Sequence, residues 1–514
     1  MEVYVSKRCI GWVKLGWVLG ALVAAQPSFA NVLQERPNIL VLISDDHNNN
    51  TIGCYGARFK TPNIDRLAKE GVRHTRAYTP SSLCVPTRYA CLTGSYPSRC
   101  RNKLFKEYNF QPPIRNGAFF CETDRTIAMA LQKAGYYTGV AGKWHNDFHN
   151  LLPLYDIPND ADPTDPTIKA MLEESVRIQQ ELIYGYGFDY AECITAGNVE
   201  DEYPQALEHH NVEYTVKGAL DFLDQAPKNK PFFLWTAFTT THGPREPIES
   251  ADVTVTHEGY TDKAVGIMRP RSEIAMKHKD VTEQTVVWMD EGIGVILDKL
   301  EKQGQLDNTL VIFLADQQNT GKSTPYECGN NIAFIARWPN GGLKAGTVNK
   351  TLLDVTDMAA TFMDVAQAKP VEGLHLDGMS IKPIWDGKTE SLKESIYTEM
   401  GYAKGVVTKE WKYIAIRYND EILRRGFNPN LSGSLKENME AGNFDLLWAK
   451  TPFGQKIKKI GWADPDQLFD LRNDPNEQHN LANNPDYQEK MVEMKKHLSR
   501  YVQSIGRPFG EFGK

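Results

Sequence analysis

The feature that most constrains the fold of this 514-residue chain is a series of short, almost purely apolar runs separated by helical patterns. Runs such as Asn38–Ser44 (NILVLIS) and Thr309–Ala315 (TLVIFLA) lack the polar alternation of a half-exposed strand. Each is therefore predicted to be a strand buried on both faces. Helices between such strands indicate an α/β fold, with a large, mostly parallel sheet sandwiched by helices.

The pattern changes after about Trp385, where the apolar runs become shorter and more amphipathic. We predict a catalytic domain over residues 31–385 and a smaller C-terminal α+β domain over 386–514. Within the first domain, further strands are expected at 137–141 and 231–238, and helices at 61–71, 127–134, 212–223 and 286–300. Within the second, strands are expected at 405–408 and 411–417, and a charged helix at 487–502.

The N-terminus has the features of a signal peptide over residues 1–30. Lys7, Arg8 and Lys14 supply a basic region, an apolar run follows at 15–25, and small residues stand at positions 28 and 30. This order is typical of a cleaved secretory signal, and the apolar run is short for a membrane span. We expect a periplasmic or secreted protein with no stable membrane span, with a membrane anchor as the alternative.

Composition excludes some classes of partner. With 58 basic and 65 acidic residues, the net charge is -7, and no basic stripe predicts nucleic-acid binding. Anion specificity must therefore come from local residues rather than from the overall field. The eight cysteines include no CxxC pair that would suggest zinc. In an exported protein they are compatible either with disulfides or with buried thiols.

Polar side chains follow four of the predicted strands at the point where each strand ends. In open parallel sheets, ligands bind at the carboxyl ends of the strands, so these side chains are expected to meet at one edge. The residues concerned are Asp45 and Asp46, then Lys143 and His145, then His242, and finally Asp316 and Gln317.

This set divides into two chemical groups. The first group has only oxygen ligands, which suit calcium, with magnesium as the alternative; its members are Asp45, Asp46, Asp316 and Gln317. The second group could supply positive charge and proton transfer for an oxyanion; its members are Lys143, His145, His242 and Lys322. Any one of these residues alone is more often structural.

A short motif connects the two groups to a known family. Residues 84–88 read Cys-Val-Pro-Thr-Arg, and Leu-Thr-Gly follows at 92–94. Together they resemble the signature of the type I, formylglycine-dependent sulfatases of the alkaline-phosphatase-like superfamily. Further motifs extend the resemblance over nearly the whole chain after residue 30: GCYG at 53–56, GKWH at 142–145, THGP at 241–244 and KxxxYE at 322–327.

The resemblance implies that a separate maturation enzyme oxidises Cys84 to formylglycine and that Arg88 holds the modified residue. One calcium ion would bind the modified Cys84 together with the oxygen ligands named above. A hydroxyl of the hydrated aldehyde would attack sulfur, and His242 or Lys322 would protonate the leaving oxygen. Lys143 would balance the sulfate charge, and His145 would take the proton that returns the aldehyde.

The sequence departs from the family pattern mainly at Gln317, where Asn or His is usual. We expect a sulfated carbohydrate substrate, such as an algal polysaccharide or glycosaminoglycan fragment. The alternatives are a phosphoester or phosphonate hydrolase on the same fold, and a non-catalytic protein that binds sulfated glycans. Candidate sugar contacts, for which packing or surface exposure is the competing role, are His47, Asn48, Trp144, His149 and Arg245.

Overall fold

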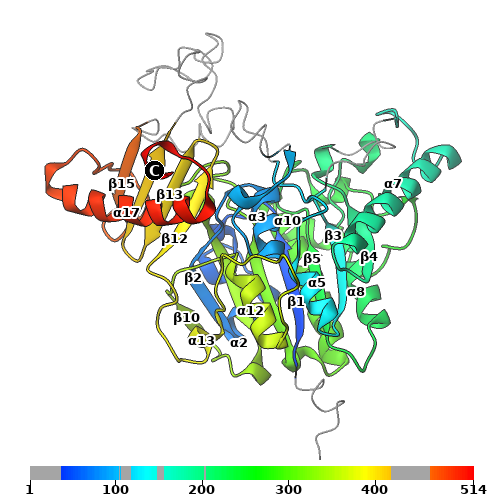
Figure 1. Ribbon diagram of the computed structural model, residues 1–514. Helices are drawn as coiled ribbons and strands as arrows, with labels where there is room; N and C mark the ends of the chain where they lie inside the picture. Colours follow the sequence, from blue (N-terminus) through cyan, green and yellow to red (C-terminus); the bar gives the residue numbers. More distant parts are fainter. Residues whose placement is uncertain are drawn as a thin grey trace, which may run out of the picture.

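A computed structural model of the protein describes residues 36–103, 105, 117–147, 156–201, 204–417 and 464–513. The predicted signal peptide and His149 lie outside the described residues. The centre of the molecule is a nine-stranded sheet with the order β10-β2-β9-β8-β1-β5-β3-β4, and β11 pairs with β2 (Figure 1). The strands are β1 (Asn38–Ser44), β2 (Val72–Tyr78), β3 (Tyr137–Lys143), β4 (Tyr190–Thr195), β5 (Phe232–Ala237), β8 (Thr309–Ala315), β9 (Asn331–Arg337), β10 (Thr347–Asn349) and β11 (Leu353–Asp354).

The prediction of a mostly parallel sheet is confirmed. Strand β1 pairs in parallel with both β5 and β8, and β3 pairs in parallel with β4 and β5. Strand β9 runs antiparallel to both of its neighbours, β2 and β8. The reversed strand was not foreseen, because a strand buried on both faces has the same apolar pattern in either direction.

Helices cover both faces of the sheet, and this explains the unbroken apolar runs. In β1, Ile39 and Val41 belong to one core cluster, whereas Leu40 and Leu42 belong to the other. Successive side chains of a strand point to opposite faces, so both sets must be apolar. The first face is covered by α3 (Cys84–Thr93), α5 (Ile127–Lys133) and α12 (Asp357–Ala366), and the second by α2 (Pro62–Glu70), α8 (Val212–Gln225) and α10 (Val281–Lys302).

Polar side chains fix where several of these helices begin. Thr126, Asn211 and Asp280 each accept a hydrogen bond from the backbone N–H three residues on, at the first turns of α5, α8 and α10. Such caps satisfy N–H groups that have no partner within the helix. The first turn of α2 is capped by a residue of another helix, because the buried Asp290 carboxylate of α10 accepts from the N–H groups of Asn63 and Ile64.

A smaller antiparallel sheet lies at one end of the large sheet and is covered by a long C-terminal helix (Figure 1). Its strand order is β12-β13-β14-β15, and Tyr397, Tyr413 and Leu468 pack there against Leu498 of the helix. This is the α+β arrangement expected for the C-terminal region. The elements are β12 (Ser395–Met400), β13 (Ala403–Thr408), β14 (Trp411–Ile416), β15 (Asp466–Asp470) and α17 (Gln488–Ile505).

The remaining elements connect these layers. Between β3 and β4 lies α7 (Pro166–Gly185), whose Leu172 is fully buried. Among the described residues, no helix is both long and apolar enough to cross a membrane. The seven described cysteines form no disulfide with one another. Short elements complete this part of the chain: β6 (Val255–Thr256), β7 (Gly259–Tyr260), α9 (Arg271–Lys277), α11 (Glu327–Asn330) and α13 (Lys382–Trp385).

Candidate active site

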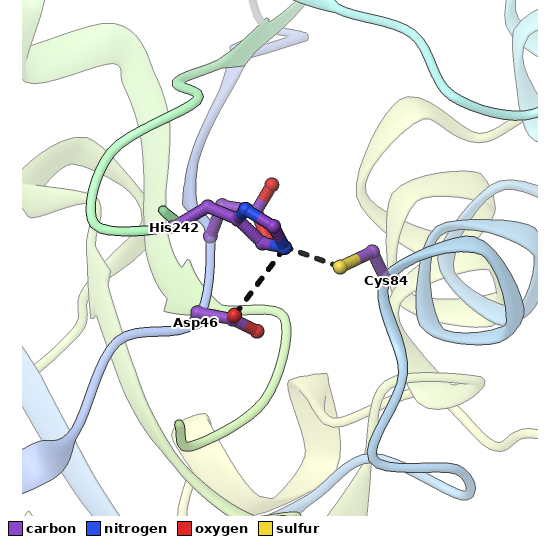
Figure 2. Close-up of side chains that lie close together, drawn as sticks. Asp46, Cys84 and His242 are labelled. Carbon is purple, nitrogen blue, oxygen red and sulfur yellow. Dashed lines mark hydrogen bonds and ion pairs between the residues drawn. The ribbon is translucent and has the colours of Figure 1, made fainter. Parts of the chain in front are cut away.

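Cys84 is the first residue of α3, which begins above the carboxyl ends of the central strands. Its Sγ lies 3.1 Å from Asp45 Oδ1 and accepts a hydrogen bond from Gln317 Nε2 at 3.1 Å. Figure 2 shows the sulfur and the Asp46 carboxylate facing the same nitrogen of the His242 ring. Burial, followed by the charge of Asp45, raises the pKa of the thiol well above its usual value. An unmodified Cys84 therefore stays protonated and is a poor nucleophile.

The carboxylates come together because β1 and β8 are neighbours. Ser44 pairs with Ala315 in the parallel ladder, so the residues that follow both strands emerge side by side. The Asp46 N–H donates to Asp316 Oδ1 at 3.0 Å. Asp45, Asp46 and Asp316 are all buried. The structure thus brings together the acidic residues that the sequence places at these strand ends.

Two cations neutralise Asp45 and Asp316. The Arg88 guanidinium, fully buried in α3, donates to Asp316 Oδ2 at 3.2 Å and lies 3.6 Å from Asp45 Oδ2. Lys143 Nζ pairs with Asp45 Oδ2. Burial opposes ionisation, but Lys143, His242 and Arg88 together hold the pKa of Asp45 well below its usual range. In contrast, burial and then the charge of Asp45 raise the pKa of Asp316 to about 7.

A second pair of basic groups meets Asp46. Lys322 Nζ is 2.8 Å from Asp46 Oδ2 and 2.7 Å from His242 Nε2, which itself lies 3.4 Å from the same oxygen. Although burial opposes it, the charge of Asp46 raises the pKa of Lys322 above its usual value. For His242, burial also opposes the charged form, but Asp45 and a hydrogen bond to Glu200 raise the pKa. Both groups can therefore carry positive charge toward a bound anion.

His145 lies just beyond the end of β3 in a left-handed backbone conformation, with φ of 57°. Its N–H donates to the Ala196 carbonyl at 2.8 Å, so the end of β4 fixes its backbone. Burial, followed by the charge of Lys143, keeps the pKa of the imidazole well below its ordinary value. A neutral imidazole is able to accept a proton.

The donor set fits a hard divalent cation. Ligand atoms of Asp45, Asp46, Cys84 and His242 lie within 4.8 Å of one another, and among these the two carboxylates offer the oxygen ligands that a hard cation prefers. The buried Oε1 of Gln317 has no hydrogen-bond partner among the described residues, whereas its Nε2 contacts Asp46 Oδ1. Rotation of this amide by half a turn would bring an oxygen to the carboxylates. Carboxylate and amide oxygens in this arrangement suit calcium better than zinc.

Three polar residues that the sequence analysis missed contact the site. Asn319 donates to Asp46 Oδ2 at 3.3 Å, Asn198 Oδ1 accepts from Lys143 Nζ at 2.6 Å, and Glu200 Oε1 lies 3.1 Å from His242 Nδ1. Asn198 and Glu200 follow β4 (YAECIT), a run of mixed polarity that was not recognised as a strand. The Tyr, Ile and Thr residues of that run are its only strand signal in the sequence.

The candidate sugar contacts differ in their exposure. Trp144 is 1% exposed and packs against Phe120 and Phe188, with ring centroids 5.7 and 5.8 Å away. The structure therefore assigns Trp144 to the core. His47 is also buried, with Nδ1 3.0 Å from Ser44 Oγ, and Asn48 Oδ1 accepts from the Thr320 N–H at 2.9 Å. Arg245, three residues after His242 in the sequence, is exposed.

Comparison with known proteins identifies the family. The model of the Sulfatase family matches residues 37–368, which is most of the chain and includes every candidate site residue. The chain belongs to the sulfatase family. It is a sulfuric ester hydrolase.

Named relatives of this sulfatase are distant in sequence. It is 24% identical over 471 residues to an ulvan-active sulfatase of Formosa agariphila, covering 87% of this chain and 76% of the relative. It is 26% identical over 405 residues to the N-acetylgalactosamine-6-sulfatase of Homo sapiens, covering 71% of this chain and 67% of the relative.

A solved structure shows the same fold. A protein in complex with its substrate D-glucosamine-2-N,6-O-disulfate superposes with a TM-score of 0.59 at 19% identity, covering 91% of this chain and 98% of that one.

Proposed function

We propose that this sulfatase hydrolyses a sulfate ester on a sulfated carbohydrate outside the cytoplasm, using a formylglycine made from Cys84 and one bound calcium ion. The observation that carries the proposal is the position of Cys84 at the start of α3. Its Sγ lies 3.1 Å from Asp45, among carboxylates and basic side chains supplied by separate strand ends. The proposal includes a division of the chain into a catalytic domain, 31–385, and a smaller C-terminal domain, 386–514.

The acidic residues of the site would bind the metal ion, and the basic residues would neutralise charge. Asp45, Asp46, Asp316 and Gln317 would hold the calcium ion. When present, formylglycine supplies a nucleophilic hydroxyl and calcium supplies positive charge next to it. Arg88 and Lys143 neutralise the carboxylates that surround position 84. Lys143 and Lys322 bring charge to the sulfate oxygens.

Three basic residues, His145, His242 and Lys322, would transfer protons. The neutral imidazole of His145 would accept the proton whose loss expels sulfate and returns the aldehyde at position 84. His242 faces Cys84 (Figure 2), and Lys322 Nζ lies 2.7 Å from His242 Nε2, so both residues are candidates to protonate the leaving oxygen.

Two observations support a carbohydrate substrate. The relatives described above act on ulvan and on N-acetylgalactosamine sulfate, and the structural neighbour binds a disulfated glucosamine. In addition, the basic run and apolar run at the N-terminus indicate export, which places the enzyme where polysaccharides are degraded.

The test begins with peptide mass spectrometry of protein made in a host that has the maturation enzyme. Conversion of Cys84 to formylglycine is expected to lower the mass of its peptide by about 18 Da. The matured protein is then assayed for sulfate release from 6-sulfated N-acetylhexosamines and ulvan oligosaccharides, with Cys84→Ser as the inactive control. Matched phosphate esters are assayed in parallel.

The outcomes separate the alternatives. Sulfate release by the matured protein but not by the control supports the proposal. Faster turnover of the phosphate esters would favour a phosphoester hydrolase. A plain thiol at position 84 with retained glycan binding would favour a non-catalytic binding protein.

A further inference from the structure

The segment that follows the edge strand β4 contacts three of the basic site residues. A Cβ added at Gly197 would lie 3.8 Å from His145 Nε2. The next residue, Asn198, accepts a hydrogen bond from Lys143 Nζ at 2.6 Å. Two residues further on, Glu200 lies in η4 (Val199–Asp201) and pairs with His242. This segment therefore lies along the row of basic groups.

The contacts of His242 define the direction of its ring. Nδ1 lies 3.1 Å from Glu200 Oε1 and 3.0 Å from the Gly243 carbonyl oxygen, so this nitrogen carries a proton and donates it. Nε2 points the other way, toward Lys322 and Asp46, with Cys84 on the same side (Figure 2). A histidine whose Nδ1–H is held by an acceptor presents Nε2 for exchange of protons.

The backbone of His242 is fixed independently of its ring. His210 Nε2 lies 3.0 Å from the His242 carbonyl oxygen and 3.1 Å from that of Pro244. This contact holds the loop after β5, but it leaves rotation of the imidazole about its side-chain bonds undetermined. Besides the carbonyl of the next residue, the only described acceptor on Nδ1 is Glu200.

We propose that Glu200 is a positioning residue that holds the His242 ring so that Nε2 faces the oxygen leaving sulfur, which makes His242 the proton donor and leaves Lys322 to balance charge. The inference rests on the proposed function. In the step concerned, the bond between sulfur and the alcohol oxygen breaks, and that oxygen keeps the electron pair. It takes the proton from His242 Nε2, which leaves a neutral ring with its remaining proton on Nδ1.

The position of Lys322 supports the assignment of charge balance to Lys322 and of proton donation to His242. Its Nζ pairs with Asp46 Oδ2 at 2.8 Å and lies 2.7 Å from His242 Nε2, so the ammonium balances the carboxylate and can supply Nε2 with the proton that this nitrogen passes to the leaving oxygen. Glu200 accepts from Nδ1 of His242, and Nε2 of the same ring faces the side of the site where Cys84 lies (Figure 2). An oriented donor of this kind is what general-acid catalysis requires.

The test uses two probes that differ in how much their leaving oxygen needs a proton: 4-nitrophenyl sulfate and unsubstituted phenyl sulfate. A positioned general acid contributes roughly 100- to 10,000-fold, and loss of its orientation alone should remove about 10- to 100-fold of this when the leaving group is basic. In matured enzyme, Glu200→Ala should lower kcat for phenyl sulfate by about this factor, but kcat for 4-nitrophenyl sulfate by less than about 3-fold. Glu200→Gln should recover most of the loss, because its amide oxygen still accepts from Nδ1–H.

Glu246→Ala is the matched control. Glu246 is also a partly exposed carboxylate paired with a histidine, with Oε2 3.2 Å from His209 Nδ1, and it contacts none of the basic site residues. The Glu246→Ala substitution should leave kcat for both probes unchanged. Melting temperature and the mass of the Cys84 peptide are measured for each variant, so that misfolding and incomplete maturation are detected directly.

The two rates decide whether Glu200 orients the His242 ring. Equal losses with both probes would overturn the inference, since a general structural role lowers both rates. Unchanged rates would also overturn it, by showing that the Gly243 carbonyl orients the ring unaided. A wild-type enzyme that releases no sulfate from either probe or from sulfated sugars would refute the proposed function itself, and the inference with it.

Discussion

Lys412 provides a quantitative test of how the small sheet is joined to the rest of the molecule. The residue belongs to β14, and its ammonium is fully buried. It lies 3.1 Å from Glu327 Oε1, 3.2 Å from Glu477 Oε1 and 3.3 Å from Asn330 Oδ1. Glu327 and Asn330 belong to α11, which precedes β9 of the large sheet. One buried cation thus balances two carboxylates between the two sheets.

Replacing Lys412 with Met keeps most of the side-chain volume but leaves both carboxylates without their shared cation. Removal of one partner of a buried ion pair costs about 3–5 kcal/mol, and we expect Lys412→Met to fall in this range. With an unfolding entropy of about 2.1 cal/mol/K per residue, 1 kcal/mol corresponds to a shift in Tm of about 1 °C for a chain of this size. The expected loss is therefore roughly 3–5 °C, measured by calorimetry at pH 7.

The control is Lys388→Met, the same substitution in an exposed ion pair. Lys388 Nζ lies 2.7 Å from Asp386 Oδ2 with its side chain 71% exposed, and such solvent-screened pairs contribute little to stability. A variant with Lys412→Met, Glu327→Gln and Glu477→Gln should recover part of the stability, because the unpaired charges are gone. If Lys412→Met and Lys388→Met lower Tm equally, the buried network does not hold the sheets together.

Three further predictions concern the site and its supports. Chelation with EDTA should lower both Tm and sulfate release, and added Ca²⁺ should restore both; saturation at about 100 times Kd adds roughly 2.7 kcal/mol, and no change in Tm would argue against a resident cation. Gly142→Ala should lower Tm by several degrees and reduce activity, because Gly142 has a φ of 85° and a Cβ there would lie 2.1 Å from the Ala237 oxygen. Burial raises the pKa of Asp290 to about 7, above its ordinary value of 3.8, so the folded state binds more protons between these values and stability falls as pH rises through 7. Asp290→Asn should flatten the change in Tm between pH 5 and 8, and an unchanged profile would contradict the buried carboxylate as its source.

Much of the fold follows from the sequence because hydrophobic periodicity is local. The runs at Asn38–Ser44 and Thr309–Ala315 have as strands the same bounds that their apolar residues have in the sequence. The polar residues after those strands had to converge, since parallel strands end at one edge. The CxPxR motif then indicated which chemistry the convergent residues serve.

Other features depend on which elements become neighbours, and no local pattern records that. The direction of β9, the burial of Trp144 among aromatic rings and the sharing of Lys412 by two glutamates all arise from pairings between segments far apart in the chain.

Short stretches of sequence were enough to identify the sulfatase family, to place the strand ends and to predict the acidic and basic residues that meet there, because each of these is a local pattern. Which basic group pairs with which carboxylate, and the contact of Glu200 with His242 Nδ1, depend instead on the fold. Glu200 reaches the site from the edge strand β4, 42 positions before that histidine. Its partner is set by the order of strands in the sheet, which no single segment encodes.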